Sequence, residues 1–281
     1  MTGLQAIKHK QFKLSQPNQY STDTINLLVL NIMPNKLETE SQILNLCSGY
    51  SKSINFTFLY PKSHHFKSDV LDHLQETYVT IDDIKDEYYD GLLVTGAPVE
   101  CIEFEEVDYW EEFKQLLEWS RTHVTQSIYF CWASQAALYA DYGIQKHNVD
   151  DKISGIFPHH SQLIDPLLDG FGDTFYLPHS RHTTLDDEDI LQQDDLTVLT
   201  TSKITGPQII VTKDHRSTFI TGHPEYSTET LSNEYFRDVD AGLEPHVPDN
   251  YFKQNNPTSD VKNYWHADGV KLFANWLNQI K

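Results

Sequence analysis

Two short segments of this 281-residue chain contain residue types that perform nucleophilic acyl chemistry. Cys131 lies between an apolar stretch and a helix-forming one, in the string IYFCWASQAALY. A cysteine at a strand-to-helix turn projects at the carboxyl edge of a sheet, and the helix N-terminus lowers the pKa of its thiol. The N–H of Trp132 is then free to donate to an oxyanion. The pattern indicates the nucleophile elbow of hydrolases with cysteine as nucleophile, although the usual flanking glycines are absent.

The second segment, His223-Pro224-Glu225, follows another apolar stretch late in the chain. Its imidazole can take the proton of a thiol, and a carboxylate two residues later can orient the ring. Each segment also has an ordinary interpretation, because an isolated cysteine is commonly a buried, inert residue and an isolated His-Pro-Glu is commonly a hydrogen-bonded loop. The order of the two, cysteine first and His-x-Glu late, favours catalysis and resembles class I glutamine amidotransferases.

Apolar stretches alternate with helical patterns, and the second half of the chain is more mixed. We expect helices after an Asn35 cap and within 61–78, 109–121, 133–142, 227–239 and 265–280, and strands at 25–32, 56–60, 91–95, 127–130, 196–200, 208–212 and 218–221. This alternation predicts an α/β protein with a parallel sheet. Residues 1–24 are polar and are expected to form an N-terminal arm, and 25–281 a single domain.

Charge and composition exclude several classes of function. Lys and Arg total 21 against 41 Asp and Glu, so the net charge is −20. Nucleic acids and anionic membranes are therefore unexpected partners, whereas a small anionic ligand needs only a few local cations. Three cysteines indicate no disulfide framework. No signal peptide or membrane span is apparent, so a cytoplasmic protein is expected. The histidine pairs lack metal-site spacing, and we expect no bound metal.

Several segments in register resemble the homoserine O-acyltransferase family, the homoserine transsuccinylases and transacetylases of methionine biosynthesis. The match runs from about Ile25 to Asn278. It rests on LNIMPNKLETE (30–40), DGLLVTGAPVE (90–100), FEEVDYW (104–110), CWASQAALYADYGI (131–144), PHSRH (178–182), GHPEYSTETLSNEYFRD (222–238) and NWLN (275–278). The resemblance implies a class I glutamine amidotransferase-like (flavodoxin-like) fold, with a mostly parallel sheet flanked by helices.

The family's reaction, acyl transfer from an acyl-coenzyme A to an amino-acid hydroxyl, gives the matching residues expected roles. Cys131 corresponds to the nucleophile, His223 to the general base and Glu225 to the residue that orients the imidazole, and the shared acyl-enzyme implies ping-pong kinetics. The other matching positions are substrate-contacting Lys152, Ser180 and Arg237, the active-site Lys36, and an oxyanion hole of the Trp132 N–H with backbone of Gly96 and Ala97.

Glu100 corresponds to the position that sets acyl specificity in the family, where glycine accompanies succinyl-CoA and glutamate accompanies acetyl-CoA. The physics agrees, because a glutamate in the acyl pocket repels the distal carboxylate of succinate. The string GAPVE therefore implies acetyl transfer. Acetyl-CoA acts as a co-substrate, and no bound cofactor is expected.

Two departures from the family pattern leave the acceptor open: the N-terminal stretch diverges, and the chain stops at Lys281 where a tail usually follows. Serine is one methylene shorter than homoserine, a difference of only ~1–3 kcal/mol in a hydrophobic pocket. An L-serine O-acetyltransferase of cysteine biosynthesis is thus an alternative to the homoserine O-acetyltransferase. The others are homoserine O-succinyltransferase, a glutamine amidotransferase-type glutaminase, and a non-catalytic binding protein. A homodimer is the family-level expectation.

Overall fold

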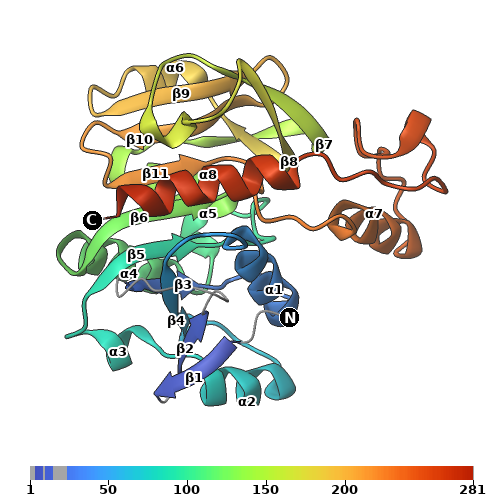
Figure 1. Ribbon diagram of the computed structural model, residues 1–281. Coiled ribbons are helices and arrows are strands. Elements are labelled where there is room, and N and C mark those ends of the chain that lie inside the picture. Colours follow the sequence, from blue (N-terminus) through green and yellow to red (C-terminus); the bar gives the residue numbers. More distant parts are fainter. Residues whose placement is uncertain (1–3, 9, 15–23, 281) are drawn as a thin grey trace.

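The architecture is a single large sheet covered by helices (Figure 1). A computed structural model describes residues 4–8, 10–14 and 24–280. Within them, eleven strands pair in the order β1-β2-β4-β3-β5-β6-β11-β10-β9-β7-β8. The strands are β1 (Leu4–Lys8), β2 (Gln11–Leu14), β3 (Thr24–Leu30), β4 (Ser53–Leu59), β5 (Tyr89–Val94), β6 (Val124–Phe130), β7 (Lys146–Ser161), β8 (Thr174–Leu185), β9 (Leu196–Ser202), β10 (Gly206–Thr212) and β11 (Ser217–Ile220).

Five neighbouring strands in the middle of the sheet, β4, β3, β5, β6 and β11, are parallel. Their registers align the last residues, since Leu30 pairs with Val94 and Phe130 pairs with Ile220. The loops that follow β3, β5, β6 and β11 therefore meet at one edge of the sheet, where α/β proteins bind ligands. The outer strands pair antiparallel, so the predicted α/β sheet is parallel at its centre and mixed overall.

Helices cover both faces because the central strands are apolar on both sides. In β3, Leu27 and Val29 face a core that includes α1 and α8, while Leu28 and Leu30 face one that includes α4 and α5. The helices are α1 (Lys36–Leu46), α2 (Ser68–Thr77), α3 (Ile81–Ile84), α4 (Trp110–His123), α5 (Trp132–Tyr142), α6 (Asp187–Leu191), α7 (Thr230–Asp240) and α8 (His266–Gln279).

Two predicted helix ends are confirmed in detail. The side chain of Asn35 accepts a hydrogen bond from the N–H of Glu38, which caps α1. Gly143 ends α5 in the left-handed conformation, with φ of 72°, and its N–H donates to Tyr139 O. Among the described residues, no helix combines the length and apolar character needed to cross a membrane.

The long hairpin of β7 and β8 is the main element that sequence patterns did not predict. The segment KHNVDDKISGIFPHHS is polar over its first half and carries no clear alternation of apolar residues. It becomes a strand because it pairs with β8 over most of its length, with Ser154 opposite Ser180. This hairpin brings Lys152 and Ser180, two predicted site residues, onto adjacent strands.

The N-terminal stretch also contains unpredicted structure. β1 pairs with β2, and β2 pairs antiparallel with β4, so these residues extend the sheet at its edge. The proposed division into an arm (1–24) and a domain (25–281) stays a prediction.

Helix α7 projects beside the sheet at the end nearest β8 (Figure 1). A small third core anchors it, in which Leu231 of α7 packs with Ile156, Tyr226 and Trp265. This core places α7 beside the β7–β8 hairpin and beside the loop that follows β11.

Candidate active site

The predicted nucleophile occupies a strained turn at the central edge of the sheet. Cys131 directly follows β6 and caps α5, with φ of 47° and ψ of −114°. Positive φ is uncommon for a residue other than glycine and is tolerated only where surrounding contacts enforce it. Here the N–H of Cys131 donates to Ile220 O at 2.8 Å, and its carbonyl accepts from the Ser134 hydroxyl at 2.7 Å. These bonds fix the elbow geometry that the sequence predicted.

The N-terminus of α5 surrounds the thiol with positive potential. The first N–H groups of a helix have no acceptor within the helix, and the helix dipole adds partial positive charge there. Trp132 is the first residue of α5, so its N–H belongs to this set. The arrangement favours negative charge at this position and offers a donor to an oxyanion.

The predicted base is buried next to its orienting carboxylate. His223 Nδ1 lies 2.7 Å from Glu225 Oε1, and both side chains are almost fully buried. The backbone N–H of His223 donates to Pro178 O at 2.8 Å, which fixes the loop after β11 to β8. The bond to Glu225 leaves Nε2 of the ring available for the nucleophile, as in a catalytic triad.

The electrostatics of His223 favour an ion pair with the nucleophile. Burial alone lowers the pKa of His223, but the negative charges of the Cys131 thiolate and Glu225, with their hydrogen bonds, outweigh it and hold this pKa well above the usual range. The site therefore favours a protonated His223 ring, which can act as an acid toward a leaving group.

Gly96, which follows β5, lies against both catalytic side chains. A methyl group placed on Gly96 would come 3.1 Å from His223 Cε1 and 3.3 Å from Cys131 Cβ. These approaches show that nucleophile and base share one small space, and that Gly96 is a glycine because a side chain would fill it. The predicted oxyanion role of the Gly96 and Ala97 backbone is compatible with this position.

A buried pair of histidines supports the loop that carries the base. His159 Nε2 and His179 Nε2 are 3.1 Å apart, and burial lowers the pKa of both, that of His159 to about 3. Both rings are therefore neutral. Gly222 packs tightly onto His179, since an added methyl would lie 3.0 Å from His179 Nε2 and 2.7 Å from Pro178 O. These histidines shape the core beneath the site.

The predicted substrate contacts Lys152 and Ser180 converge on Glu234, a residue of α7 that sequence reasoning did not identify. Lys152 Nζ lies 3.5 Å from Glu234 Oε2, and the Ser180 hydroxyl donates to the same oxygen. Tyr226 donates to the other carboxylate oxygen at 2.8 Å. Glu234 thereby connects the β7–β8 hairpin to the loop of His223. Its spacing three residues before Arg237 on one helix was the available signal.

Arg237 lies on the outer side of this group. Its guanidinium pairs with Asp238 at 2.8 Å and its side chain is 65% exposed, whereas Asp238 also lies 3.8 Å from Lys152 Nζ. The structure thus brings Arg237 to the same region as Lys152 through a shared carboxylate, with the guanidinium directed to Asp238 rather than to Ser180.

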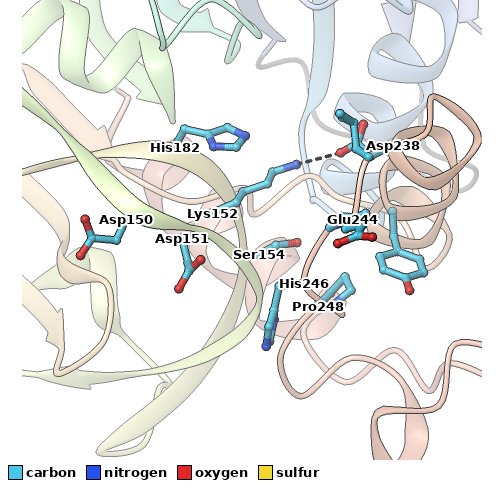
Figure 2. A pocket seen from close by; sticks show the side chains of 12 residues that line it. Asp150, Asp151, Lys152, Ser154, His182, Asp238, Glu244, His246 and Pro248 are labelled. Carbon is cyan, nitrogen blue, oxygen red and sulfur yellow. Dashed lines mark ion pairs between the residues drawn. The ribbon is translucent and has the colours of Figure 1, made fainter.

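A cavity of about 280 Å³ adjoins this group (Figure 2). Lys152 extends across it toward Asp238, and His182 lies on the same side as Lys152 (Figure 2). Acidic side chains are frequent around the cavity. Its lining comprises Asp150, Asp151, Lys152, Ser154, His182, Tyr235, Asp238, Leu243, Glu244, Pro245, His246 and Pro248.

Comparison with known proteins identifies the family. A family model described as homoserine O-succinyltransferase matches residues 6–281. The chain belongs to this family. Homoserine O-acetyltransferases of Streptococcus gordonii strain Challis and Streptococcus pneumoniae strain Taiwan19F-14 are each 44% identical to it, over 90% of this chain and 81% of theirs.

Solved structures agree on the fold of this family member. A glutamine amidotransferase from Thermotoga maritima has a TM-score of 0.60 at 14% identity and covers 91% of this chain and 97% of its own. A glutamine amidotransferase from Methylobacillus flagellatus has a TM-score of 0.56 at 12% identity, over 93% and 96%. At such identities the likeness shows the fold alone.

The predicted family and the predicted acyltransferase activity are confirmed by the family model and the streptococcal relatives. The predicted fold is confirmed by the solved structures.

Two further residues of this acyltransferase were predicted near the site. Lys36 is buried, its ammonium donates to Asn31 O at 2.8 Å, and burial lowers its pKa to about 8 against the opposing charge of Glu40. Glu100 is partly exposed in the loop after β5, where its carbonyl accepts a hydrogen bond from Lys146 at 2.6 Å. The acyl-selecting role of Glu100 stays a prediction.

One cluster outside the predicted site has the composition of a metal site. Side-chain atoms of His147, Asp186 and Asp189 lie within 4.8 Å of one another, and His147 Nε2 is 2.9 Å from Asp186 Oδ2. The three residues belong to β7 and the start of α6 and lie mostly exposed. Sequence spacing gave no sign of them because they are distant along the chain.

Proposed function

We propose that this protein transfers an acetyl group from acetyl-CoA to the hydroxyl of L-homoserine, giving O-acetyl-L-homoserine. The observation that carries the proposal is the buried set of Cys131, His223 and Glu225 in a chain whose relatives at 44% identity are named homoserine O-acetyltransferase. The resulting ester is the product expected of an enzyme of methionine biosynthesis.

The first half-reaction acetylates the nucleophile. The Cys131 thiolate attacks the thioester carbonyl, and the tetrahedral oxyanion accepts hydrogen bonds from the Trp132 N–H and from backbone near Gly96. Collapse breaks the bond to the sulfur of CoA. Protonated His223 donates its proton to that departing thiolate, so CoA leaves as a thiol and a neutral imidazole faces acetyl-Cys131.

The second half-reaction discharges the acyl-enzyme. The neutral imidazole of His223 takes the proton of the homoserine hydroxyl, whose oxygen attacks the acetyl carbonyl. Release of the Cys131 thiolate restores the ion pair, and Glu225 orients the ring in both steps. Because one site handles both substrates in turn, the mechanism is ping-pong.

The cavity beside Lys152 suits an amino-acid acceptor. Its acidic residues, which include Asp150, Asp151 and Glu244, attract an ammonium group, and Lys152 and Arg237 offer cations to a carboxylate. A zwitterion needs both signs of charge close together. Tyr226 and Glu234 connect this region to the catalytic base.

The acetyl preference rests on Glu100. Its carboxylate in the loop after β5 would oppose the terminal carboxylate of a succinyl group. The family model's description favours the succinyl donor as the second candidate.

A donor-and-acceptor matrix tests the proposal. Initial rates are measured with acetyl-CoA and succinyl-CoA, each with homoserine and with serine, and ammonia release is followed with glutamine alone. We expect acetyl-CoA with homoserine to give the highest kcat/KM and parallel double-reciprocal lines. Preference for succinyl-CoA or for serine would replace the proposed donor or acceptor. Glutaminase activity without acyl transfer would refute the proposal.

A further inference from the structure

A second cavity, of about 370 Å³, borders the loop that follows β5. Met33, Pro98 and Val99 form part of its wall. The sulfur of Met33 would lie 3.8 Å from a methyl on Gly96, the glycine that touches Cys131 and His223. This cavity, which we call the donor cavity, therefore lies next to the nucleophile but is lined by different residues from the cavity beside Lys152.

The charges of the two cavities differ in sign. The basic residues lining the donor cavity are Lys36, His64, His65 and Lys67, and none of its described lining residues is a carboxylate. The cavity beside Lys152 instead contains several carboxylates. A basic cavity is notable in a chain of net charge −20, because local cations are what an anionic ligand needs there.

The remaining wall of the donor cavity is apolar and held in place. The His64 ring contacts Phe66 edge-on at 4.5 Å and Tyr109 at 5.4 Å between centroids. Asp108 Oδ1 lies 2.8 Å from His64 Nδ1, so this carboxylate pairs with the histidine that packs against the two aromatic rings. Lys36 Nζ lies 5.3 Å from the Phe66 centroid. The wall is thus preorganised for an apolar ligand segment.

Lys67 is the most accessible cation at this cavity. It is exposed and immediately precedes α2, and its side chain makes no capping hydrogen bond to that helix. The N–H groups of the first turn of α2 add partial positive charge at the same place. An exposed ammonium beside a helix N-terminus is suited to a phosphate group.

We propose that the donor cavity binds the coenzyme A portion of the acyl donor, with the pantetheine arm along the apolar wall and a phosphate group at Lys67. This assignment rests on the proposed function, because acyl-CoA is the donor in that reaction. Donor and acceptor then approach Cys131 from different cavities. The cavity beside Lys152 is lined by four carboxylates, whereas the described lining of the donor cavity has basic residues and no carboxylate.

Calorimetric titration of CoA into the full-length protein tests this assignment without requiring turnover. For Lys67→Ala we expect the Kd of CoA to rise about fivefold, and for Lys67→Glu tenfold or more, as for loss or reversal of a charge-assisted contact. Lys62→Ala is the matched control, since Lys62 belongs to the same segment, pairs with Asp82 at 3.3 Å and does not line the cavity. It should leave the Kd unchanged within twofold.

A truncated donor provides the second measurement. Lys67→Glu should raise the KM for acetyl-CoA while leaving kcat, and all constants for S-acetyl-pantetheine, unchanged, because that donor lacks phosphates. Equal CoA affinity in the wild type and both Lys67 variants would overturn the assignment while leaving the proposed function intact. Tight CoA binding that weakens in these variants, without acetylation of any amino acid, would uphold the cavity and overturn the proposed function. A wild type that binds no CoA would overturn both.

Discussion

The ring of Tyr226 stacks on the imidazole of His223, with 4.0 Å between centroids and 21° between the planes, while its hydroxyl donates to Glu234 at 2.8 Å. Burial first, and then the charges of Glu234 and Glu225, raise the pKa of Tyr226 well above the usual range, so the hydroxyl stays a donor. One side chain thus joins the catalytic base to the carboxylate that holds Lys152.

Removing only the hydroxyl should separate the two half-reactions. Tyr226→Phe keeps the stacked ring but loses a hydrogen bond to a charged group, a contact that contributes about 1.5 kcal/mol. We expect kcat/KM for homoserine to fall about tenfold, and the rate of Cys131 acetylation to stay within twofold. Stopped-flow measurement of CoA release gives the first half-reaction. An equal fall in both would show that Tyr226 acts on the base rather than on the acceptor.

The close approach at Gly96 makes a small substitution informative. In Gly96→Ala the new methyl meets His223 Cε1 at 3.1 Å and Cys131 Cβ at 3.3 Å, so the base or the loop must shift. Misplacing a catalytic group by a fraction of an ångström to one ångström costs up to about 10²-fold in rate. We expect kcat to fall by about that factor with a melting temperature within a few degrees of wild type. Ala97→Gly, at the neighbouring residue, is the matched control and should retain most activity.

Lys36 should make stability depend on pH in a defined direction. Its pKa falls from the usual 10.5 to about 8 in the folded protein, chiefly through burial. Between pH 8 and pH 10.5, Lys36 binds a proton more fully in the unfolded chain than in the folded protein. Burial of the Lys36 ammonium therefore lowers the free energy of unfolding by its full amount below pH 8, and this loss of stability fades as the pH rises to 10.5. Relative to wild type, Lys36→Met should therefore be more stable at pH 7 than at pH 9.5, by about 1–3 kcal/mol.

Urea denaturation of the wild type and of Lys36→Met at pH 7 and pH 9.5 gives their difference in free energy of unfolding. The contributions of the other titrating groups are the same in both proteins and cancel in this difference. A pH-independent difference between the two proteins would show that Lys36 keeps its ordinary pKa in the fold.

Glu100 offers a test of acyl selection. Glu100→Gly removes a carboxylate from the loop after β5, so a succinyl group no longer meets a like charge there. We expect the ratio of kcat/KM for succinyl-CoA to that for acetyl-CoA to rise by at least about 10²-fold. Glu103→Gly, in the same loop region, controls for general loss of negative charge. An unchanged ratio in Glu100→Gly would remove this residue from acyl selection.

The catalytic end of the sheet could be predicted because its elements are local. The segments that became β3, β5, β6 and β11 each contain a short apolar run. Cys131 directly follows β6, and His223 lies three residues after the end of β11. Parallel pairing aligns such residues at one edge, so position along the chain was enough to bring nucleophile and base together. Asn35 and Gly143 likewise carry their structural role in their own residue type.

The acceptor side could not be predicted in the same way, because it depends on long-range pairing. Residues of β7 become a strand only by pairing with β8, and Glu234 gains its importance from partners on three separate elements. Neither feature has a local sequence signal. The resemblance to a family identified Lys152 and Ser180, but their common contact with Glu234 emerged only from the fold.

The most direct test of the account is the acyl-enzyme itself. The protein is mixed with acetyl-CoA without acceptor, quenched and measured by intact-protein and peptide mass spectrometry, and homoserine is then added to a second sample. We predict one acetyl group on Cys131, absent in Cys131→Ala and discharged by homoserine far faster than by water. An unmodified Cys131 in protein that still acetylates homoserine, or an adduct that homoserine fails to discharge, would contradict the mechanism.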